Sequence, residues 1–241
     1  MVKIPAQSKN KEEYVHEIFS AIAHRYDLLN SLLSFNRDKA WRRFAVLHTG
    51  LKPGGRGLDV CCGTGMFAIE QAKVVGPGGK VVGVDFCAKM LARAKINIGK
   101  TPYGSVIELV HGNAINLPLT DNTFDCATIG FALRNVPDIP KTIAEMVRVV
   151  RPGGKVVSLE LSRPTAPVFK QLYYLYFNYL VPIIGRLGVG ISGPYGYLPA
   201  SLKNFPDQEE IKNIFEDTGL KDVRYYKLTG GVVSVHVGTV A

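Results

Sequence analysis

A glycine turn in the first third of the chain has the residue types and spacing of a nucleotide-binding site. Residues 63–65, Gly-Thr-Gly, follow the apolar run 57–60 and precede a helical pattern that starts at Met66. Glycines let backbone approach a ligand where a side chain would collide, and the first turn of a helix presents free N–H groups. Strand, turn and helix in this order are typical of the ligand-binding end of a doubly wound α/β fold.

Two carboxylates near the turn bear on which ligand it binds. Residues 63–68 have the pattern G-x-G-x-x-A, and Asp85 ends the next apolar run, where a carboxylate can hold ribose hydroxyls. These features fit both NAD and S-adenosyl-L-methionine. Asp59 favours the second, because its charge would repel a pyrophosphate and attract a sulfonium and an ammonium group. The alternative for Asp59 is a structural role, capping the N–H groups of the turn.

Two later segments place further candidates at the same edge of the predicted sheet. Asn113 follows the third apolar run, where its amide suits the amino group of an adenine, and Ala114 suits packing against the ring. An Asx-turn is the alternative role for Asn113. After the fourth run, Gly130 allows close approach of backbone, and Arg134 is expected to face the group that reacts.

The elements that must position these residues alternate along the chain. Near-continuous apolar runs predict strands and amphipathic patterns predict helices, which together favour a mostly parallel sheet with helices on both faces. The predicted strands are 57–61, 80–85, 106–110, 124–130 and 155–161. The predicted helices between them are 66–75, 89–98 and 139–149. Segments 223–228 and 232–240, joined by Thr-Gly-Gly, predict a C-terminal antiparallel hairpin.

Two segments lie outside this alternation. Residues 11–48 carry apolar side chains at helical spacing and predict an N-terminal helical lid. Residues 164–200 are dense in aromatics and interrupted by Pro and Gly, and they predict an insertion over the ligand-binding edge. We expect residues 1–241 to form a single domain, because this length is short for two.

Composition restricts the class of protein. The chain has 46% hydrophobic and 20% charged residues and a net charge of +9, which suits a globular protein with a basic surface. The N-terminus lacks the apolar core of a signal peptide, no apolar run reaches about 20 residues, and the four cysteines lack disulfide or metal spacing. We therefore expect a cytoplasmic protein, with peripheral contact at the inner face of the membrane as a further option.

Several longer motifs resemble those of one enzyme family. YDLLNSLLSFNRDKAW (26–41) and RVVRPGGKVVSLELSRP (148–164) resemble the two signatures of the UbiE/MenG family of quinone-biosynthesis C-methyltransferases. FALRNV (131–136) and the tail that begins FPDQEEIKNIF (205–215) are also similar to family members. The likeness extends over nearly the whole chain.

This resemblance implies a class I methyltransferase fold, Rossmann-like with a seven-stranded sheet, and S-adenosyl-L-methionine as cofactor. It implies a polyprenylated quinol as substrate, either demethylmenaquinol or the benzoquinol precursor of ubiquinone. The family's contact that is usually a serine falls on Gly130, which offers only backbone. The predicted cofactor-binding residues are Asp59, Gly63, Thr64, Gly65, Asp85, Asn113, Ala114 and Gly130.

Methylation of a quinol carbon requires ionisation of the neighbouring phenol, whose pKa is near ~10 in water. We expect Arg134 to stabilise the phenolate, and water or a carboxylate such as Asp27 to accept the proton. The alternatives are structural, an ion pair for Arg134 and a helix cap for Asp27. The histidines share no ligand spacing, so no metal site is predicted.

The aromatic residues of the insertion bear on partners. Tyr173, Tyr174 and Phe177 suit the wall of an isoprenoid-tail site, and Lys170 and Arg186 suit contact with an anionic membrane. Core packing or a homodimer interface is the alternative for these aromatics. No nucleic-acid partner is expected, because aromatic and basic residues form no binding motif.

Other function classes remain open at this point. A methyltransferase acting on another small aromatic molecule fits the same residues. A non-catalytic cofactor-binding protein is an alternative, because Asp38, Met66 and Gly130 differ from the family pattern. An NAD-dependent oxidoreductase is disfavoured by Asp59.

Overall fold

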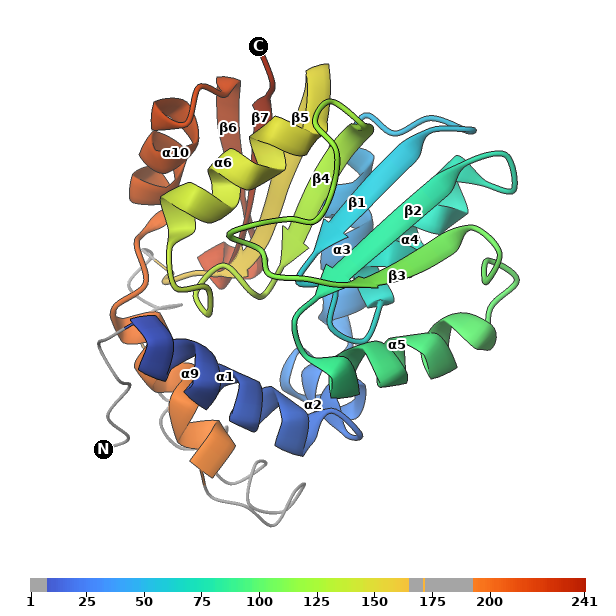
Figure 1. The fold of residues 1–241 in the computed structure, drawn as a ribbon. Helices are drawn as coiled ribbons and strands as arrows, with labels where there is room; N and C mark the ends of the chain where they lie inside the picture. The colour runs from blue at the N-terminus through green and yellow to red at the C-terminus, as the bar shows by residue number, and fades with distance from the viewer. Residues whose placement is uncertain (1–7, 165–170, 172–192) are drawn as a thin grey trace.

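A mixed seven-stranded sheet forms the centre of the protein (Figure 1). The computed structural model describes residues 8–164, Gln171 and residues 193–241. The strand order is β3-β2-β1-β4-β5-β7-β6; the first five strands of the chain are parallel, and β7 runs antiparallel to both β5 and β6. The strands are β1 (Arg56–Val60), β2 (Lys80–Asp85), β3 (Ile107–His111), β4 (Phe124–Gly130), β5 (Val150–Leu161), β6 (Lys221–Leu228) and β7 (Val233–Thr239).

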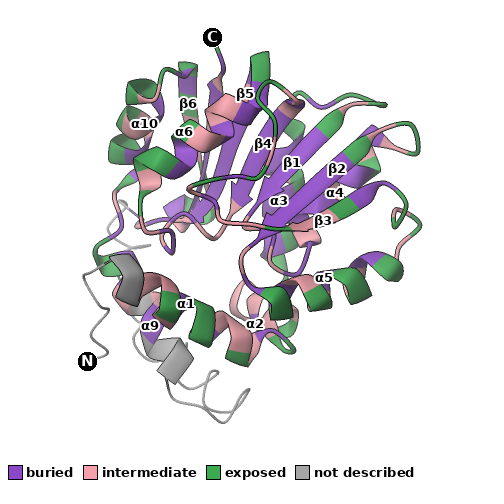
Figure 2. Ribbon diagram, in the orientation of Figure 1, coloured by how far each residue is buried: buried purple, intermediate pink, exposed green. Residues whose placement is uncertain are grey.

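Helices cover both faces of this sheet. On one face, α3 (Arg37–Leu47) and α5 (Ala88–Gly99) both contact α4 (Met66–Val75). On the other face, α6 (Ile139–Val149) contacts α10 (Gln208–Asp217). The five inner strands β1, β2, β4, β5 and β7 are mostly buried between these layers (Figure 2), as expected for a sheet covered on both sides. The edge strands β3 and β6 are largely accessible, with one buried residue each.

Three further helices lie together beyond the carboxyl ends of the parallel strands (Figure 1). They are α1 (Ser8–Ile22), α2 (Tyr26–Leu33) and α9 (Gly193–Lys203). α1 contacts both α5 and α9, and Tyr14 of α1 packs edge-on against Tyr197 of α9 with ring centroids 5.8 Å apart. In open α/β sheets ligands bind at the carboxyl ends of the strands, so these helices form a roof over the expected ligand edge.

The structure confirms the predicted fold class. Four elements have the predicted bounds: β2 (80–85), β4 (124–130), α4 (66–75) and α6 (139–149). The two C-terminal strands, β6 and β7, are antiparallel as predicted. β5 begins at Val150 rather than Lys155, because Val150 pairs with Phe124 before the ladder shifts register and resumes at Lys155. α10 begins with the capping box of Asp207 and Glu210.

The predicted insertion is described only in part. Its C-terminal end is α9, which lies at the ligand edge (Figure 1). The predictions for Lys170, Tyr173, Tyr174, Phe177 and Arg186 concern residues outside the described ones. No helix in the described part of the chain is long and apolar enough to cross a membrane.

Candidate functional site

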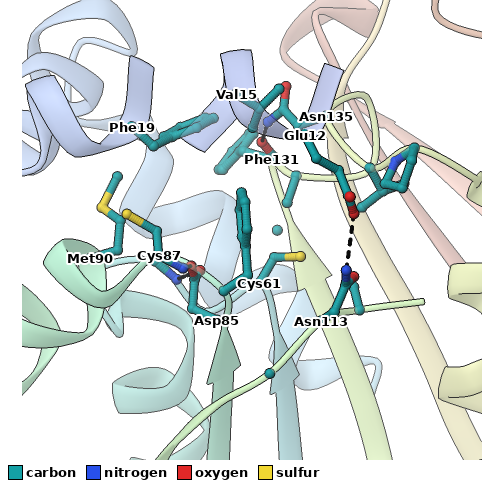
Figure 3. Close-up of a pocket in the computed structure, with 18 of the residues that line it drawn as sticks. Glu12, Val15, Phe19, Cys61, Asp85, Cys87, Met90, Asn113, Phe131 and Asn135 are labelled. Carbon is teal, nitrogen blue, oxygen red and sulfur yellow. Dashed lines mark hydrogen bonds between the residues drawn. The ribbon is translucent and has the colours of Figure 1, made fainter. Parts of the chain in front are cut away.

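A cavity lies between the carboxyl ends of β1, β2 and β3 and the underside of α1 (Figure 3). Cys61, Asp85 and Asn113 line it from the sheet, and Val15 and Phe19 line it from α1. About 710 Å³ of space lies between its walls, counted with the mouth that opens to solvent. We call this space the first cavity.

The glycine turn has the backbone geometry that the sequence predicts. Gly63 (φ +54°) and Gly65 (φ +80°) both adopt the left-handed region that favours glycine. A Cβ on Gly63 would meet nothing within 4 Å, so the backbone here faces open space, whereas a Cβ on Gly65 would lie 3.3 Å from Ala94. The backbone at Gly63 is therefore open to close approach by a ligand, and Gly65 allows close packing of α4 on α5.

Asp85 lies at the floor of the first cavity, only 6% exposed. One carboxylate oxygen accepts the N–H of Gly63 and the other accepts that of Cys87, both at 2.8 Å. Burial raises the pKa of Asp85, and the two backbone donors oppose that rise. These donors fix the carboxylate in place, and each oxygen retains a lone pair for a hydroxyl of a ligand.

Asp59 is buried in a smaller space on the other side of the turn, which we call the side chamber. Its carboxylate accepts the N–H of Ala68 at 3.0 Å and the hydroxyl of Thr128 at 3.1 Å. The first of these bonds is a cap on α4, as the structural alternative predicts. Burial raises the pKa of Asp59 to about 7, although both hydrogen bonds and the charge of Arg42 lower it. Arg42 also lines the side chamber, so a carboxylate and a guanidinium share one small space.

Asn113 and Ala114 lie at the rim of the first cavity, after β3. The side-chain oxygen of Asn113 accepts the N–H of Ile115 at 3.2 Å, the Asx-turn of the alternative interpretation. Its Nδ2 donates to Glu12 of α1 at 3.0 Å (Figure 3). Sequence reasoning missed Glu12, because it lies in a polar stretch 101 positions from Asn113 and carries no local motif.

Thr64 and Asp27 lie close together, and Thr64 lines the side chamber. The hydroxyl of Thr64 donates to one carboxylate oxygen of Asp27, and Asn97 donates to the other at 2.8 Å. Asp27 does not line the first cavity or the side chamber. It ties α2 to the glycine turn and to α5, and its role as a base stays a prediction.

Arg134 forms a buried ion pair with Glu160 of β5; the two side chains are 7% and 2% exposed. The same nitrogen, Nη1, also donates to the carbonyl of Phe131 at 2.8 Å. Burial is the largest single effect and lowers the pKa of Arg134, but the charge and hydrogen bond of Glu160, together with the nearby Tyr26 and Tyr197, raise the pKa overall. This is the ion pair of the structural alternative. Among the described residues, however, the Nε of Arg134 has no hydrogen-bond partner.

A second cavity opens on the far side of Phe131. Its polar lining residues are Arg134, Asp38, Ser34 and Asn30, and the others, among them Trp41, are apolar. Phe131 also lines the first cavity and the side chamber, so its side chain lies where all three spaces meet. Its backbone has φ +56°, a conformation that a bulky residue adopts only when its surroundings impose it.

Gly130 precedes Phe131 and lines both the first cavity and the side chamber. A Cβ there would lie 2.7 Å from the ring of Phe67. The buried Phe67 ring therefore leaves no room for a side chain at residue 130 unless the ring moves. No cluster of three or more His, Cys, Asp or Glu side chains able to hold a metal occurs in the described part.

Fold and site together define a class I methyltransferase. A methyltransferase from Aquifex aeolicus, whose structure is described as SAM dependent, superimposes with a TM-score of 0.64 at 21% identity, covering 89% of this chain and 98% of its own. At that identity the likeness concerns the fold alone. In this chain the sheet has a glycine turn after β1 and a carboxylate, Asp85, at the end of β2.

The chain belongs to the ubiE/COQ5 methyltransferase family, whose sequence pattern matches residues 7–240. A demethylmenaquinone methyltransferase from Desulfitobacterium hafniense is 49% identical over 95% of this chain and 91% of its own length. A demethylmenaquinone methyltransferase from Staphylococcus aureus is 46% identical over 97% and 95%. The chain is therefore an S-adenosyl-L-methionine-dependent methyltransferase.

The residues of the two inner spaces fit that cofactor. Asp85 offers a fixed carboxylate to ribose hydroxyls, and the apolar walls of the first cavity suit a flat ring. The side chamber pairs Asp59 with Arg42, which matches the ammonium and carboxylate of an amino-acid end. A pyrophosphate would instead meet the buried carboxyl group of Asp59.

Proposed function

We propose that the protein methylates a ring carbon of demethylmenaquinol. The proposal is carried by the Nε of Arg134, a buried donor without a described partner that belongs to a residue lining the second cavity. A buried donor left unpaired costs about 1–3 kcal/mol, and an oxygen of a bound acceptor would remove that cost. The curated relatives are named for action on demethylmenaquinone, which supports this acceptor over the benzoquinol precursor.

In this proposal each cavity has its own ligand. The first cavity and the side chamber hold the cofactor, through Asp59, Asp85, Asn113 and the glycine turn. The cofactor supplies an electrophilic methyl group on its sulfonium. The second cavity holds the quinol ring against Trp41, with Arg134 beside one ring oxygen.

Arg134 would favour the ionised form of that oxygen, which makes the adjacent ring carbon nucleophilic. Glu160 holds the guanidinium in position and at the same time offsets part of its charge. When the new carbon–carbon bond has formed, the ring carbon must lose its proton to restore aromaticity. In this proposal water or a carboxylate such as Asp27 accepts the phenol proton when that oxygen ionises, and water accepts the ring proton after methyl transfer; both oxygens of Asp27 also accept hydrogen bonds from Thr64 and Asn97.

The test is methyl transfer to defined acceptors. Purified protein is incubated with methyl-labelled S-adenosyl-L-methionine and a short-tailed demethylmenaquinol kept reduced by dithionite. We expect the label in a menaquinol product identified by mass spectrometry. The oxidised quinone is the matched control, since its ring carbon is not nucleophilic. Label found only in a benzoquinol, or in no quinol at all, would contradict the proposal.

We also propose that the protein collects this lipid-soluble substrate by peripheral contact with the inner face of the membrane, from the cytoplasmic side. The net charge of +9 supports the proposal, because such surfaces are anionic. Co-sedimentation with anionic vesicles and not with neutral ones is expected. The alternative is that the aromatic residues of 165–192 form a homodimer interface. Light scattering tests this alternative by measuring the molecular mass in solution.

A further inference from the structure

Glu12 is the polar residue through which the roof helix α1 meets the rim of the first cavity. Its Oε1 accepts a hydrogen bond from Nδ2 of Asn113 at 3.0 Å, and both side chains line the cavity (Figure 3). This hydrogen bond joins α1 to the loop after β3 at the wall of the first cavity.

The orientation of the Asn113 amide is fixed by chemistry on both sides. The N–H of Ile115 can only donate, so the amide oxygen must face it. A Glu12 carboxylate can only accept, so the amide NH₂ must face α1. Asn113 therefore presents a donor at the rim, and Glu12 presents an acceptor. One N–H of Asn113 and one oxygen of Glu12 have no partner among the described residues.

Because the amide of Asn113 and the carboxylate of Glu12 are joined by a hydrogen bond, the remaining N–H and the remaining oxygen form a neighbouring donor and acceptor, the arrangement that matches one edge of a purine. Adenine carries an amino donor beside the acceptor nitrogen N1, the complement of an acceptor on Glu12 and a donor on Asn113. Hypoxanthine has a carbonyl oxygen in place of the amino group and carries a hydrogen on N1. Bound in the same way, its carbonyl oxygen would face the acceptor on Glu12 and its N–H would face the donor on Asn113.

We propose that Glu12 determines base specificity by accepting a hydrogen bond from the adenine amino group of the cofactor, while Asn113 donates to N1. This inference rests on the placement of the cofactor in the proposed function. It replaces the expectation that the Asn113 amide alone meets the amino group. The roof helix then takes part in recognising the cofactor and does not only cover it.

Neighbouring contacts anchor the part of α1 that carries Glu12. Lys11 donates from Nζ to the carbonyl of Val136 at 2.6 Å, and burial lowers its pKa. Val15, one turn further along α1, is 2% exposed and lines the first cavity. An acceptor fixed on a packed helix loses little freedom on binding, which is what a specificity contact requires.

The test compares two ligands that cannot react, S-adenosyl-L-homocysteine and its inosine counterpart, by isothermal titration calorimetry. Wild-type protein is expected to bind the adenine ligand more tightly by at least about tenfold, the range of one hydrogen bond to a charged group. Glu12→Ala should lose most of that preference by weakening the adenine ligand alone. Glu13→Ala, which removes an exposed carboxylate from the same helix, should leave both affinities unchanged.

Glu12→Gln sharpens the result, because its amide can turn a donor towards the hypoxanthine oxygen while preserving the size of the side chain. Its affinity for the inosine ligand should rise relative to wild type. If Glu12→Ala and Glu12→Gln weaken both ligands by one common factor, Glu12 only latches the helix and the inference is wrong. If wild-type protein binds neither ligand, the cofactor placement itself fails.

Discussion

At the scale of single residues, the Arg134–Glu160 pair has two separable functions. Both side chains are nearly inaccessible, so each neutralises a charge that the other would leave buried. The guanidinium also retains the free Nε that we assign to the quinol oxygen. A structural role and a chemical role therefore meet in one side chain, and a single substitution would change both.

A double substitution separates the two roles. Arg134→Met should reduce the free energy of unfolding by about 3–5 kcal/mol, because Glu160 stays buried and unpaired. Arg134→Met combined with Glu160→Met should recover most of that loss in urea denaturation. Turnover of the stable double variant should remain below wild type by about 100-fold or more, or about 2.7 kcal/mol. If the double variant regains both stability and turnover, Arg134 has no chemical role beyond its ion pair with Glu160.

Asp59 gives the cofactor site a pH dependence. With its pKa raised to about 7 by burial, its carboxyl group is mostly neutral at pH 6 and mostly charged at pH 8. If the charged form attracts the ammonium group, affinity for S-adenosyl-L-homocysteine should rise about fivefold to tenfold over that interval. Calorimetry on Asp59→Asn should show weaker binding with a flat profile. If affinity changes with pH in the same way in the wild-type protein and in Asp59→Asn, Asp59 only caps α4 and does not attract the ligand.

At the scale of elements, the junction of β7 and α10 contains a buried histidine. His236 is 1% exposed, and its Nε2–H donates to the carbonyl of Gln208 at 2.9 Å. Burial lowers the pKa of His236 to about 4, so the folded protein keeps this ring neutral. Below pH 6.5 the unfolded chain binds a proton that the folded chain excludes. Stability is therefore complete above pH 6.5 and falls as the pH decreases towards 4.

This junction predicts a measurable loss of stability in acid. At pH 5 the loss from His236 should be about 2 kcal/mol relative to pH 7.5. The free energy of unfolding of His236→Gln is measured in urea at both pH values. The difference between the two values should be smaller than in the wild-type protein by that amount, whatever the absolute stability of the variant. His24→Gln, which changes an exposed histidine, should show the wild-type difference. An unchanged difference in His236→Gln would mean that the ring is protonated in the folded state.

At the scale of the whole molecule, the sheet and one side of the site were predictable from the sequence. Buried parallel strands have near-continuous apolar runs, and their carboxyl ends meet at one edge, so Asp85, Asn113 and the glycine turn were expected to converge. Local chemistry also predicts the α10 capping box. These features depend on residues close together in the chain or on the general geometry of the fold.

The roof of the site was not predictable in the same way. Glu12 meets Asn113 only because α1 returns over the strand ends, and nothing near Glu12 in the chain indicates it. Glu160 did carry a signal, since a carboxylate within an apolar strand requires a buried partner, but its choice of Arg134 depends on the pairing of β4 with β5. The bond between Asp27 and Thr64 likewise depends on how α2 packs on the turn.

Phe131 imposes a constraint on how such an enzyme can diverge. Its side chain lines the first cavity, the side chamber and the second cavity, and its backbone is held in a strained conformation. Any substitution there changes the walls of all three spaces at once, so under the proposed function the affinities for methyl donor and acceptor cannot be adjusted independently at this position. Evolution towards a differently shaped acceptor must instead act through the residues that line only the second cavity, such as Trp41, Leu161 and Leu198.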